Sequence, residues 1–341
     1  KKPSGVWIMA YTTIDDPTLY FSSTIWTGNA TDDRAIVIDG TGMQPDFVWI
    51  KSRNDTDNHR LVDSVRGATK HMESDGSGAE QTSSNVKTFT STGVTLSTNG
   101  AVNANSELYA SWAWKAGTSF TNDASSTGIG SIDSAGSVST DAGFSICSFT
   151  GNGTGGASVK HGLSTKPAMM IIKNRDEADS WQVYHHKNTS APATETLQLN
   201  ETGATSDTSN RWNDTEPTTA IFTLGDNTTV NKNTIKYIGY IFSEKKGYSK
   251  FGSYTGNGNV NGPFIYTGFK PAFIIAKESS EARDWQLWDN KRLGYNASGG
   301  NKNLIPNKTD AEDTYADIDI LSNGFKLRNS SAADNKVSQT Y

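Results

Sequence analysis

Pro45-Asp46-Phe47-Val48-Trp49-Ile50-Lys51 is an apolar run between a proline and a lysine, and the chain repeats it twice. The later copies span residues 167–173 and 271–277, and each again begins with proline and ends with lysine. Proline is tolerated at the first residue of a strand, so each run is typical of a short buried β-strand. A strand that recurs in this way predicts a chain built from repeated β modules.

Other landmarks repeat in the same order around this run. An aromatic residue followed by Thr-Gly-Asn precedes each copy, and an alternating aromatic strand begins at Tyr109 after the first copy and at Tyr237 after the second. His59, Trp181 and Trp285 occupy equivalent positions beyond the three lysines. Four landmarks in one order, at near-constant spacing, predict a threefold repeat.

The units indicated by these landmarks are short and rich in turn residues. Short strands separated by Gly and Asn, without a long stretch of helical periodicity, favour an all-β fold of three tandem β-sandwich repeats, jelly-roll or concanavalin-like. Gly, Ser, Thr and Asp dominate the stretch between the first two units, which predicts a linker. The predicted divisions are an N-terminal segment 1–19, repeats 20–116, 143–247 and 248–341, and a linker 117–142.

The third unit has no closing strand in this sequence, because Tyr341 stands where that strand begins in the other two units. Three alternatives stay open: the native chain continues beyond Tyr341, this copy lacks the strand, or another segment supplies it. The run Gly5-Val6-Trp7-Ile8-Met9-Ala10-Tyr11 lies outside the first unit and has the composition of a strand. We hypothesise that residues 5–11 pair with an open sheet edge of a neighbouring copy by strand donation.

Composition narrows the classes of function. Hydrophobic residues make up 34% of the chain and its net charge is −5, so thin cores are expected and a basic surface for nucleic acid or anionic membrane is not. Cys147 is the single cysteine, which leaves no internal disulfide and no cysteine cluster for zinc. No apolar run approaches the ~20 residues that cross a bilayer. The start of the sequence lacks a signal peptide pattern and an initial Met, as expected for a fragment of a longer chain.

Catalytic motifs are missing from the sequence. It contains no G-x-S-x-G elbow, no H-E-x-x-H pair and no phosphate-binding loop, so we predict a protein that is not an enzyme and uses no cofactor or metal. Carboxylate pairs are abundant, but no acid recurs in all three units. Asp63 and Asp289 are equivalent, and His185 replaces them in the second unit.

Residues shared by the units are expected to form a framework, whereas residues found in one unit are better candidates for binding. A glycan can stack on an exposed tryptophan, so the candidate contacts are Trp212, Trp288, His185 and His186. The predicted framework residues are Pro45, Lys51, Pro167, Lys173, Trp181, Pro271, Lys277 and Trp285.

These motifs resemble a repeat of large virion structural proteins of marine bacteriophages. The resemblance rests on the aromatic-Thr-Gly-Asn motif, residues 44–53, Asp63-Ser64-Val65-Arg66-Gly67 and Trp112-Ala113-Trp114-Lys115-Ala116-Gly117, and it covers nearly the whole chain. It implies concanavalin-type or related β-sandwiches in a tail fibre or another virion structural protein. Because the pattern describes a framework, it implies no catalytic residue, and the departure at His185 leaves no role common to all three units.

We therefore expect a tail-fibre or fibre-like component, exposed on an extracellular virion, that attaches to a host surface. Modules in series would supply length and multivalency. The expected partners are other virion proteins or copies of the chain itself, with a trimer as one option, and a host surface glycan. The alternatives are a capsid or tail decoration protein, a bacterial adhesin or surface filament protein, and a glycan depolymerase, although the period of roughly 100 residues does not suit the β-helix expected of a depolymerase.

Overall fold

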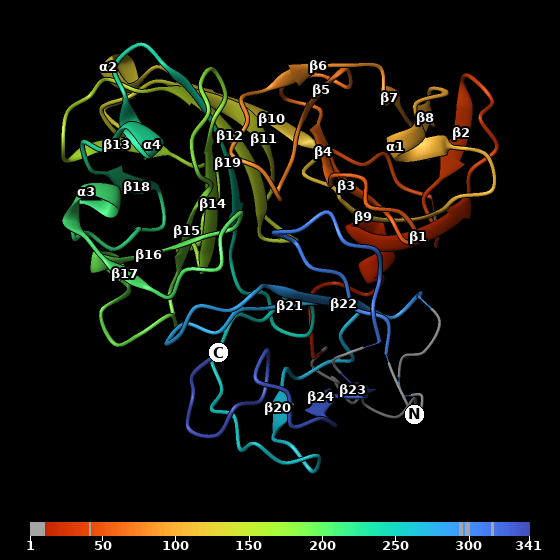
Figure 1. The fold of residues 1–341 in the computed structure, drawn as a ribbon. Coiled ribbons are helices and arrows are strands. Elements are labelled where there is room, and N and C mark those ends of the chain that lie inside the picture. Colours follow the sequence, from red (N-terminus) through yellow and green to blue (C-terminus); the bar gives the residue numbers. More distant parts are fainter. Residues whose placement is uncertain (1–10, 41, 293–295, 297–300, 315–316) are drawn as a thin grey trace, which may run out of the picture.

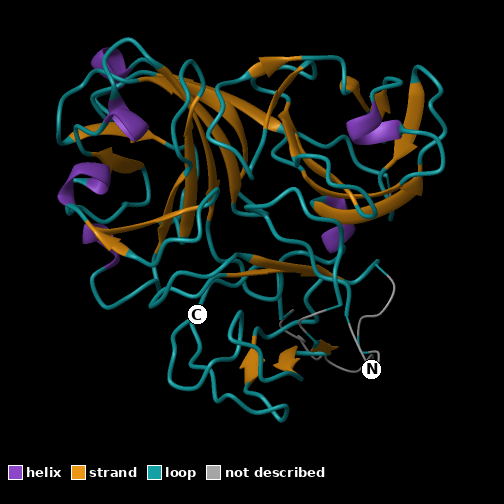
Figure 2. Cartoon of the chain, in the orientation of Figure 1, coloured by secondary structure: helices purple, strands orange, loops and turns teal. Residues whose placement is uncertain are grey.

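The computed structural model describes residues 11–40, 42–292, 296, 301–314 and 317–341. The predicted all-β sandwich class is confirmed, because the described chain forms mainly antiparallel strands and its helices span at most four residues. Three lobes surround a common centre (Figure 1), and most strands are joined by loops (Figure 2). The lobes contain residues 17–116, 117–247 and 248–341, which we call units 1, 2 and 3.

Unit 1, at the upper right of Figure 1, pairs an inner sheet of order β1-β9-β3-β4-β5-β6 with an outer sheet of order β2-β8-β7. Its elements are η1 (Pro17–Leu19), β1 (Phe21–Thr27), β2 (Arg34–Val37), β3 (Phe47–Ser52), β4 (Arg60–Asp63), β5 (Lys70–Met72), β6 (Gln81–Thr82), β7 (Val86–Thr90), β8 (Gly93–Leu96), α1 (Gly100–Asn103) and β9 (Leu108–Trp114).

Unit 2, at the upper left, pairs an inner sheet of order β10-β11-β12-β19-β14-β15-β16-β17 with the outer strands β13 and β18. Its elements are β10 (Thr118–Asn122), α2 (Ala124–Thr127), β11 (Ser134–Ser139), β12 (Phe144–Thr150), β13 (Ala157–Lys160), β14 (Met169–Asn174), β15 (Gln182–His185), η2 (Pro192–Thr194), β16 (Glu195–Gln198), β17 (Ser206–Asp207), α3 (Ser209–Trp212), β18 (Ile221–Leu224), α4 (Thr228–Asn231) and β19 (Lys236–Phe242).

Unit 3, at the bottom, pairs the inner strands β21 and β22 with an outer sheet of order β20-β24-β23. Its elements are β20 (Phe264–Tyr266), β21 (Phe273–Ala276), β22 (Gln286–Asp289), β23 (Ile318–Leu321) and β24 (Gly324–Leu327). Apart from Tyr11, the run 5–11 lies outside the described residues.

Each unit is a sandwich because successive side chains of a strand point to opposite faces of its sheet. In β9, Tyr109 and Ala113 pack against the outer sheet of unit 1, whereas Ala110, Trp112 and Trp114 face the centre of the molecule. Equivalent apolar clusters fill the sandwiches of units 2 and 3. The inner strands are therefore apolar on both faces.

One further core lies where the three inner sheets meet. It contains buried side chains of every unit, among them Trp112, Trp181 and Trp285, and Phe47 of unit 1 stacks on Tyr240 of unit 2 with ring centroids 4.1 Å apart. This shared core corrects the expectation of modules standing in series. A unit of about 100 residues with few hydrophobic residues buries little apolar surface by itself. When each of the three units packs one face of its inner sheet into a common core, the chain buries more apolar surface.

Tryptophan side chains also connect neighbouring units by hydrogen bonds to the backbone. Trp181 Nε1 of unit 2 donates to Glu73 O of unit 1, and Trp285 Nε1 of unit 3 donates to Gln198 O of unit 2, both at 2.9 Å. Since both indoles are buried, each needs such a partner.

His59 makes the equivalent contact in unit 1. Its Nδ1 accepts a hydrogen bond from Trp49 Nε1 (2.8 Å), so its Nε2 carries the proton and donates to Ile305 O of unit 3 (3.1 Å). Burial holds the pKa of His59 well below its usual value, which keeps this neutral tautomer. These three hydrogen bonds therefore link unit 2 to unit 1, unit 3 to unit 2, and unit 1 to unit 3.

The linker predicted at residues 117–142 is instead part of the unit 2 sheet. β10 pairs with β11, and β11 pairs with β12 from Ser134↔Phe149 to Ser139↔Phe144. Ser, Thr and Gly occur both in linkers and at the polar positions of outer strands, so composition did not separate the two. The correction leaves units 1 and 2 joined without a free spacer.

Candidate functional site

The predicted framework prolines and lysines lie at equivalent buried places. Pro45, Pro167 and Pro271 precede β3, β14 and β21, and all three are buried. Each lysine Nζ donates to the carbonyl of the next residue: Lys51 to Ser52, Lys173 to Asn174, and Lys277 to Glu278, at 2.6–2.8 Å. Burial lowers the pKa of each lysine to about 8. These contacts hold the strand ends and leave the ammonium groups out of reach of a ligand.

Three buried asparagines hold the Thr-Gly-Asn turns, and the sequence comparison missed them. Asn103, Asn231 and Asn335 are fully buried, and each Oδ1 accepts the backbone N–H of the asparagine in its turn at 2.8–3.1 Å. Each Nδ2 donates to two carbonyls. The signal was available in the sequence, because each of these asparagines comes six residues before Tyr109, Tyr237 or Tyr341.

The carboxylates Asp63 and Asp289 form buried ion pairs at boundaries between units. Arg66 pairs with Asp63, and the Tyr240 hydroxyl of unit 2 donates to Asp63 Oδ2 at 2.8 Å. Arg292 pairs with Asp289 at 2.6 Å, and Trp112 Nε1 of unit 1 donates to Asp289 Oδ2 at 3.0 Å. Burial by itself would raise the pKa of Asp289, but the Arg292 guanidinium holds that pKa below its usual value. Both carboxylates are sealed from solvent, so they join units and do not offer an acid or base to a substrate.

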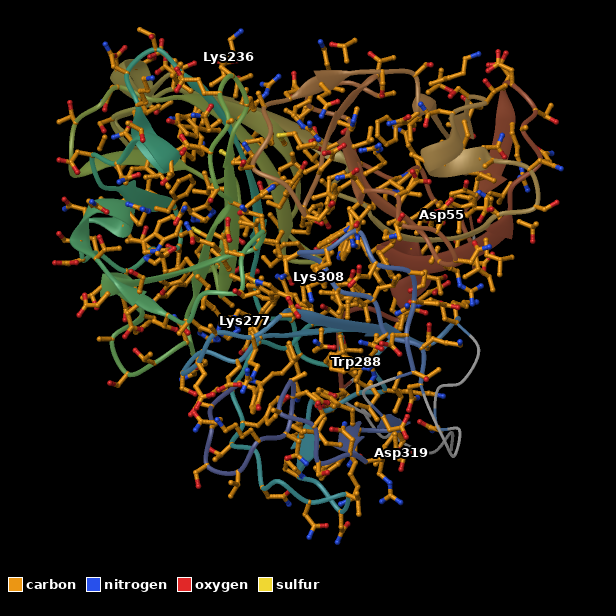
Figure 3. All side chains as sticks on the ribbon, in the orientation of Figure 1. Asp55, Lys236, Lys277, Trp288, Lys308 and Asp319 are labelled. Carbon is orange, nitrogen blue, oxygen red and sulfur yellow. The ribbon has the colours of Figure 1, made fainter. Side chains whose placement is uncertain are left out.

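Two of the four predicted glycan contacts, Trp212 and Trp288, were wrong because both side chains are buried. Trp212 has no exposed surface; its Nε1 donates to Glu195 O (2.9 Å), and its ring packs edge-on against Tyr184. Trp288 is 1% exposed and lies inside unit 3, between β22 and the outer sheet (Figure 3). Neither ring can stack on a sugar.

His185 and His186 lie at the junction of units 2 and 3. Their rings are 5.7 Å apart, the His185 ring is 6.2 Å from the Phe251 ring, and His186 Nε2 lies 3.2 Å from Phe251 O. Burial lowers the pKa of His185 to about 4, so this imidazole is neutral at pH 7. A glycan contact by this partly buried pair stays a prediction.

A cluster of exposed aromatic side chains lies on unit 3, where the sequence comparison did not look. Phe264 and Tyr266 occupy alternate positions of β20, so both point outward, and they are 44% and 61% exposed. Tyr11 is 51% exposed. We call these three residues the β20 aromatic patch.

Tyr11 is held within the patch by contacts from two sides. Its hydroxyl lies over Gly268 and beside the Tyr266 hydroxyl, which raises the pKa of Tyr11. Lys246 Nζ lies 4.6 Å from the centre of the Tyr11 ring, a cation–π distance. The patch therefore combines apolar ring faces with hydroxyl groups and a cation at its rim.

The outward positions of the other outer sheets carry no such rings. Ala35 and Val37 of β2 are the equivalents of Phe264 and Tyr266 in unit 1, and Ser158 and Lys160 of β13 are those in unit 2. Comparing the units position by position along β20 would have revealed this difference from the sequence. The patch is thus specific to one unit.

A shallow hollow of about 690 Å³ in unit 2 is lined by Ser134, Arg175, Lys236 and a single carboxylate, Asp133, which already accepts the backbone N–H of Ala124. Within the described ranges, no three His, Cys, Asp or Glu side chains are grouped to hold a metal ion. No described helix is long and apolar enough to pass through a bilayer.

The comparisons with known proteins place the chain in a family. A family model described as Domain of unknown function (DUF7483) matches residues 16–341, so the chain belongs to that family. The match spans all three units, which agrees with their shared core. No curated protein and no solved structure matches the chain.

Proposed function

We propose that this DUF7483 chain is a structural component of a bacteriophage virion that attaches to a host surface glycan through the β20 aromatic patch. The observation that carries the proposal is the exposure of Phe264, Tyr266 and Tyr11 on one unit alone. Large apolar side chains gathered on a surface mark binding sites more often than scattered ones do. The resemblance of the repeat to phage virion structural proteins supplies the setting.

The chemistry of the patch suits a sugar better than a charged polymer. Aromatic faces pack against the C–H face of a pyranose ring, and tyrosine hydroxyls can donate to sugar oxygens. The net charge of −5 does not favour an anionic partner such as nucleic acid. In this proposal the chain binds the glycan, and the buried carboxylates Asp63 and Asp289 take no part because they cannot reach it.

A binding measurement tests the patch directly. The purified chain is titrated by calorimetry with neutral hexose oligosaccharides, and Phe264→Ala/Tyr266→Ala is expected to weaken binding at least tenfold, which corresponds to about 1.4 kcal/mol. Val37→Ala is the matched control, because Val37 occupies the equivalent outward position in unit 1 and is 59% exposed. Equal affinity of the double variant and the native chain would remove the patch from the proposal.

A capsid or tail decoration protein is the second candidate, favoured by the shared core. Three units packed around one centre form a body and do not extend as a fibre would. Electron microscopy of purified particles with a gold label on this chain separates the two roles. Label on tail projections supports host attachment, whereas label spread over the capsid supports decoration.

A further inference from the structure

The hollow of unit 2 is lined in part by residues that lie outside the repeated part of the sequence. Residues 117–142 form β10, α2 and β11, and this stretch contributes Ser131, Asp133 and Ser134 to the lining. The neighbouring strand β12 contributes Ser148. The volume of about 690 Å³ lies within the roughly 300–1,000 Å³ of small-ligand pockets. The hollow therefore has room for a small ligand and is built with a segment found in unit 2 alone.

Hydrogen bonds fix the stretch that leads into β11. Ser131 N and Ile132 N both donate to Ser158 O of β13, at 2.8 and 3.0 Å, and Ser158 N donates to Ser131 Oγ at 2.8 Å. Asp133 Oδ1 accepts the backbone N–H of Ala124 at 2.8 Å. This side of the hollow is ordered before a ligand arrives, which lowers the entropy cost of binding.

Arg175 is held in the lining by a carboxylate of unit 1. Its Nε and Nη2 donate to the two carboxylate oxygens of Glu80, at 2.9 and 3.2 Å. Its Nη1 donates to Ser148 Oγ at 3.4 Å. A guanidinium has five N–H donors, and the second hydrogen of Nη1 has no acceptor among the described residues. Arg175 therefore offers an oriented donor to a ligand.

Lys236 adds a cation that the equivalent place in unit 1 lacks. The strand registers give Lys236 the place of Leu108 in unit 1, and they give Ser148 the place of Ile25. Lys236 is exposed at the top of unit 2 (Figure 3) and has no ion-pair partner in the described part of the chain. Unit 2 thus carries an ammonium group and a hydroxyl group where unit 1 carries two apolar side chains.

The lining groups determine which ligand chemistry fits. Lys236 and Nη1 of Arg175 can form charge-assisted hydrogen bonds to a carboxylate. The hydroxyls of Ser148 and Thr150 and the carboxylate of Asp133 can accept hydrogen bonds from ligand hydroxyl groups. The negative charge of Asp133 disfavours a dianion such as phosphate. A ring with one carboxylate and several hydroxyl groups matches both kinds of partner.

We propose that this hollow of unit 2 binds a hexuronate residue, a sugar ring that carries one carboxylate. Lys236 and Arg175 bind the carboxylate, and Ser148, Thr150 and Asp133 bind the hydroxyl groups. The site is separate from the β20 aromatic patch on unit 3, and it does not depend on glycan binding by that patch.

Calorimetric titration of the full chain with a disaccharide of one hexuronate and one neutral hexose tests the site. The native chain should bind it, and the methyl ester of the same disaccharide, which lacks the charge, should bind about tenfold or more weakly. Lys236→Met should weaken binding of the acid by a similar factor, whereas Lys236→Arg keeps the charge and should bind like the native chain. Lys187→Met is the matched control, because Lys187 is also exposed on unit 2 but does not line the hollow.

Two further variants separate this site from other effects. Ser148→Ile places the side chain of unit 1 in the hollow and should abolish binding, with a thermal unfolding curve to verify that the variant folds. Phe264→Ala/Tyr266→Ala should leave binding of the hexuronate disaccharide unchanged. Failure of the β20 aromatic patch and failure of this site are therefore distinguishable.

Four outcomes overturn the proposal. The native chain does not bind the disaccharide, or it binds the acid and the methyl ester equally. Native chain and Lys236→Met bind the acid with the same affinity, which removes the lysine from the site. Inorganic phosphate displaces the disaccharide when both are at the same concentration, which assigns the hollow to simple anions and not to a sugar.

Discussion

Asp334 is buried at a position that holds valine in the other two units. Val102, Val230 and Asp334 each directly precede a framework asparagine, and none has exposed surface. Asn329 Nδ2 donates to Asp334 Oδ2 at 3.0 Å, but Oδ1 has no hydrogen-bond partner among the described residues. Burial raises the pKa of Asp334 to about 7. Ionisation of this carboxyl therefore destabilises the folded chain.

The direction and size of the effect follow from linkage. An unfolded aspartate has a pKa of about 3.9, so between about pH 4 and pH 7 the folded chain keeps a proton that the unfolded chain has released. The contribution to stability is present below pH 4 and is lost as the pH rises through 7. A pKa difference of about 3 units corresponds to a change of about 4 kcal/mol in the free energy of unfolding.

Replacing Asp334 should remove this pH dependence. The gain in unfolding free energy of Asp334→Val over the native chain should grow by about 4 kcal/mol from pH 4 to pH 8, measured by urea denaturation with tryptophan fluorescence. Subtracting the pH dependence of the native chain's unfolding free energy removes the contribution of the histidines, which lowers stability as the pH falls. Asp334→Asn keeps the shape of the side chain without a titrating group and should show the same pH trend as Asp334→Val. Val230→Asp places a carboxyl at the equivalent position of unit 2 and should lower the stability of the chain as that carboxyl ionises. A difference between Asp334→Val and the native chain that stays constant from pH 4 to pH 8 would refute the reasoning.

Three further predictions follow from the buried charged groups and the shared core. Arg292→Met leaves Asp289 buried without its cation and should lower the unfolding free energy by about 3–5 kcal/mol; a loss below about 1 kcal/mol would mean that water reaches Asp289. Because Trp181 and Trp285 belong to one shared core, calorimetry should show a single unfolding transition for all three units, whereas separate transitions would contradict the shared core. Burial lowers the pKa of His161 to about 4, so acidification below pH 6.5 should destabilise the native chain more than His161→Gln, with the difference measured by urea denaturation.

The sequence by itself located the strands that follow the three repeated prolines and the alternating strands at Tyr109 and Tyr237, and it predicted a repeated unit. Prolines at 45, 167 and 271, turns at Thr-Gly-Asn and period-2 alternation are local signals, because each depends on the backbone preference of a few neighbouring residues. The same signals led to the sandwich class.

Only the tertiary structure decided what the strands pack against. The alternation in the segments of β9 and β19 predicted a core on one face, whereas the structure buries both faces. Whether the second face meets another unit depends on contacts far apart in the sequence, such as Trp285 with Gln198. For the same reason, Trp212 and Trp288 were mistaken for binding residues and residues 117–142 for a linker. The exposure of Phe264 and Tyr266 is likewise nonlocal, because a side chain on an outer strand is free only where no other segment covers it.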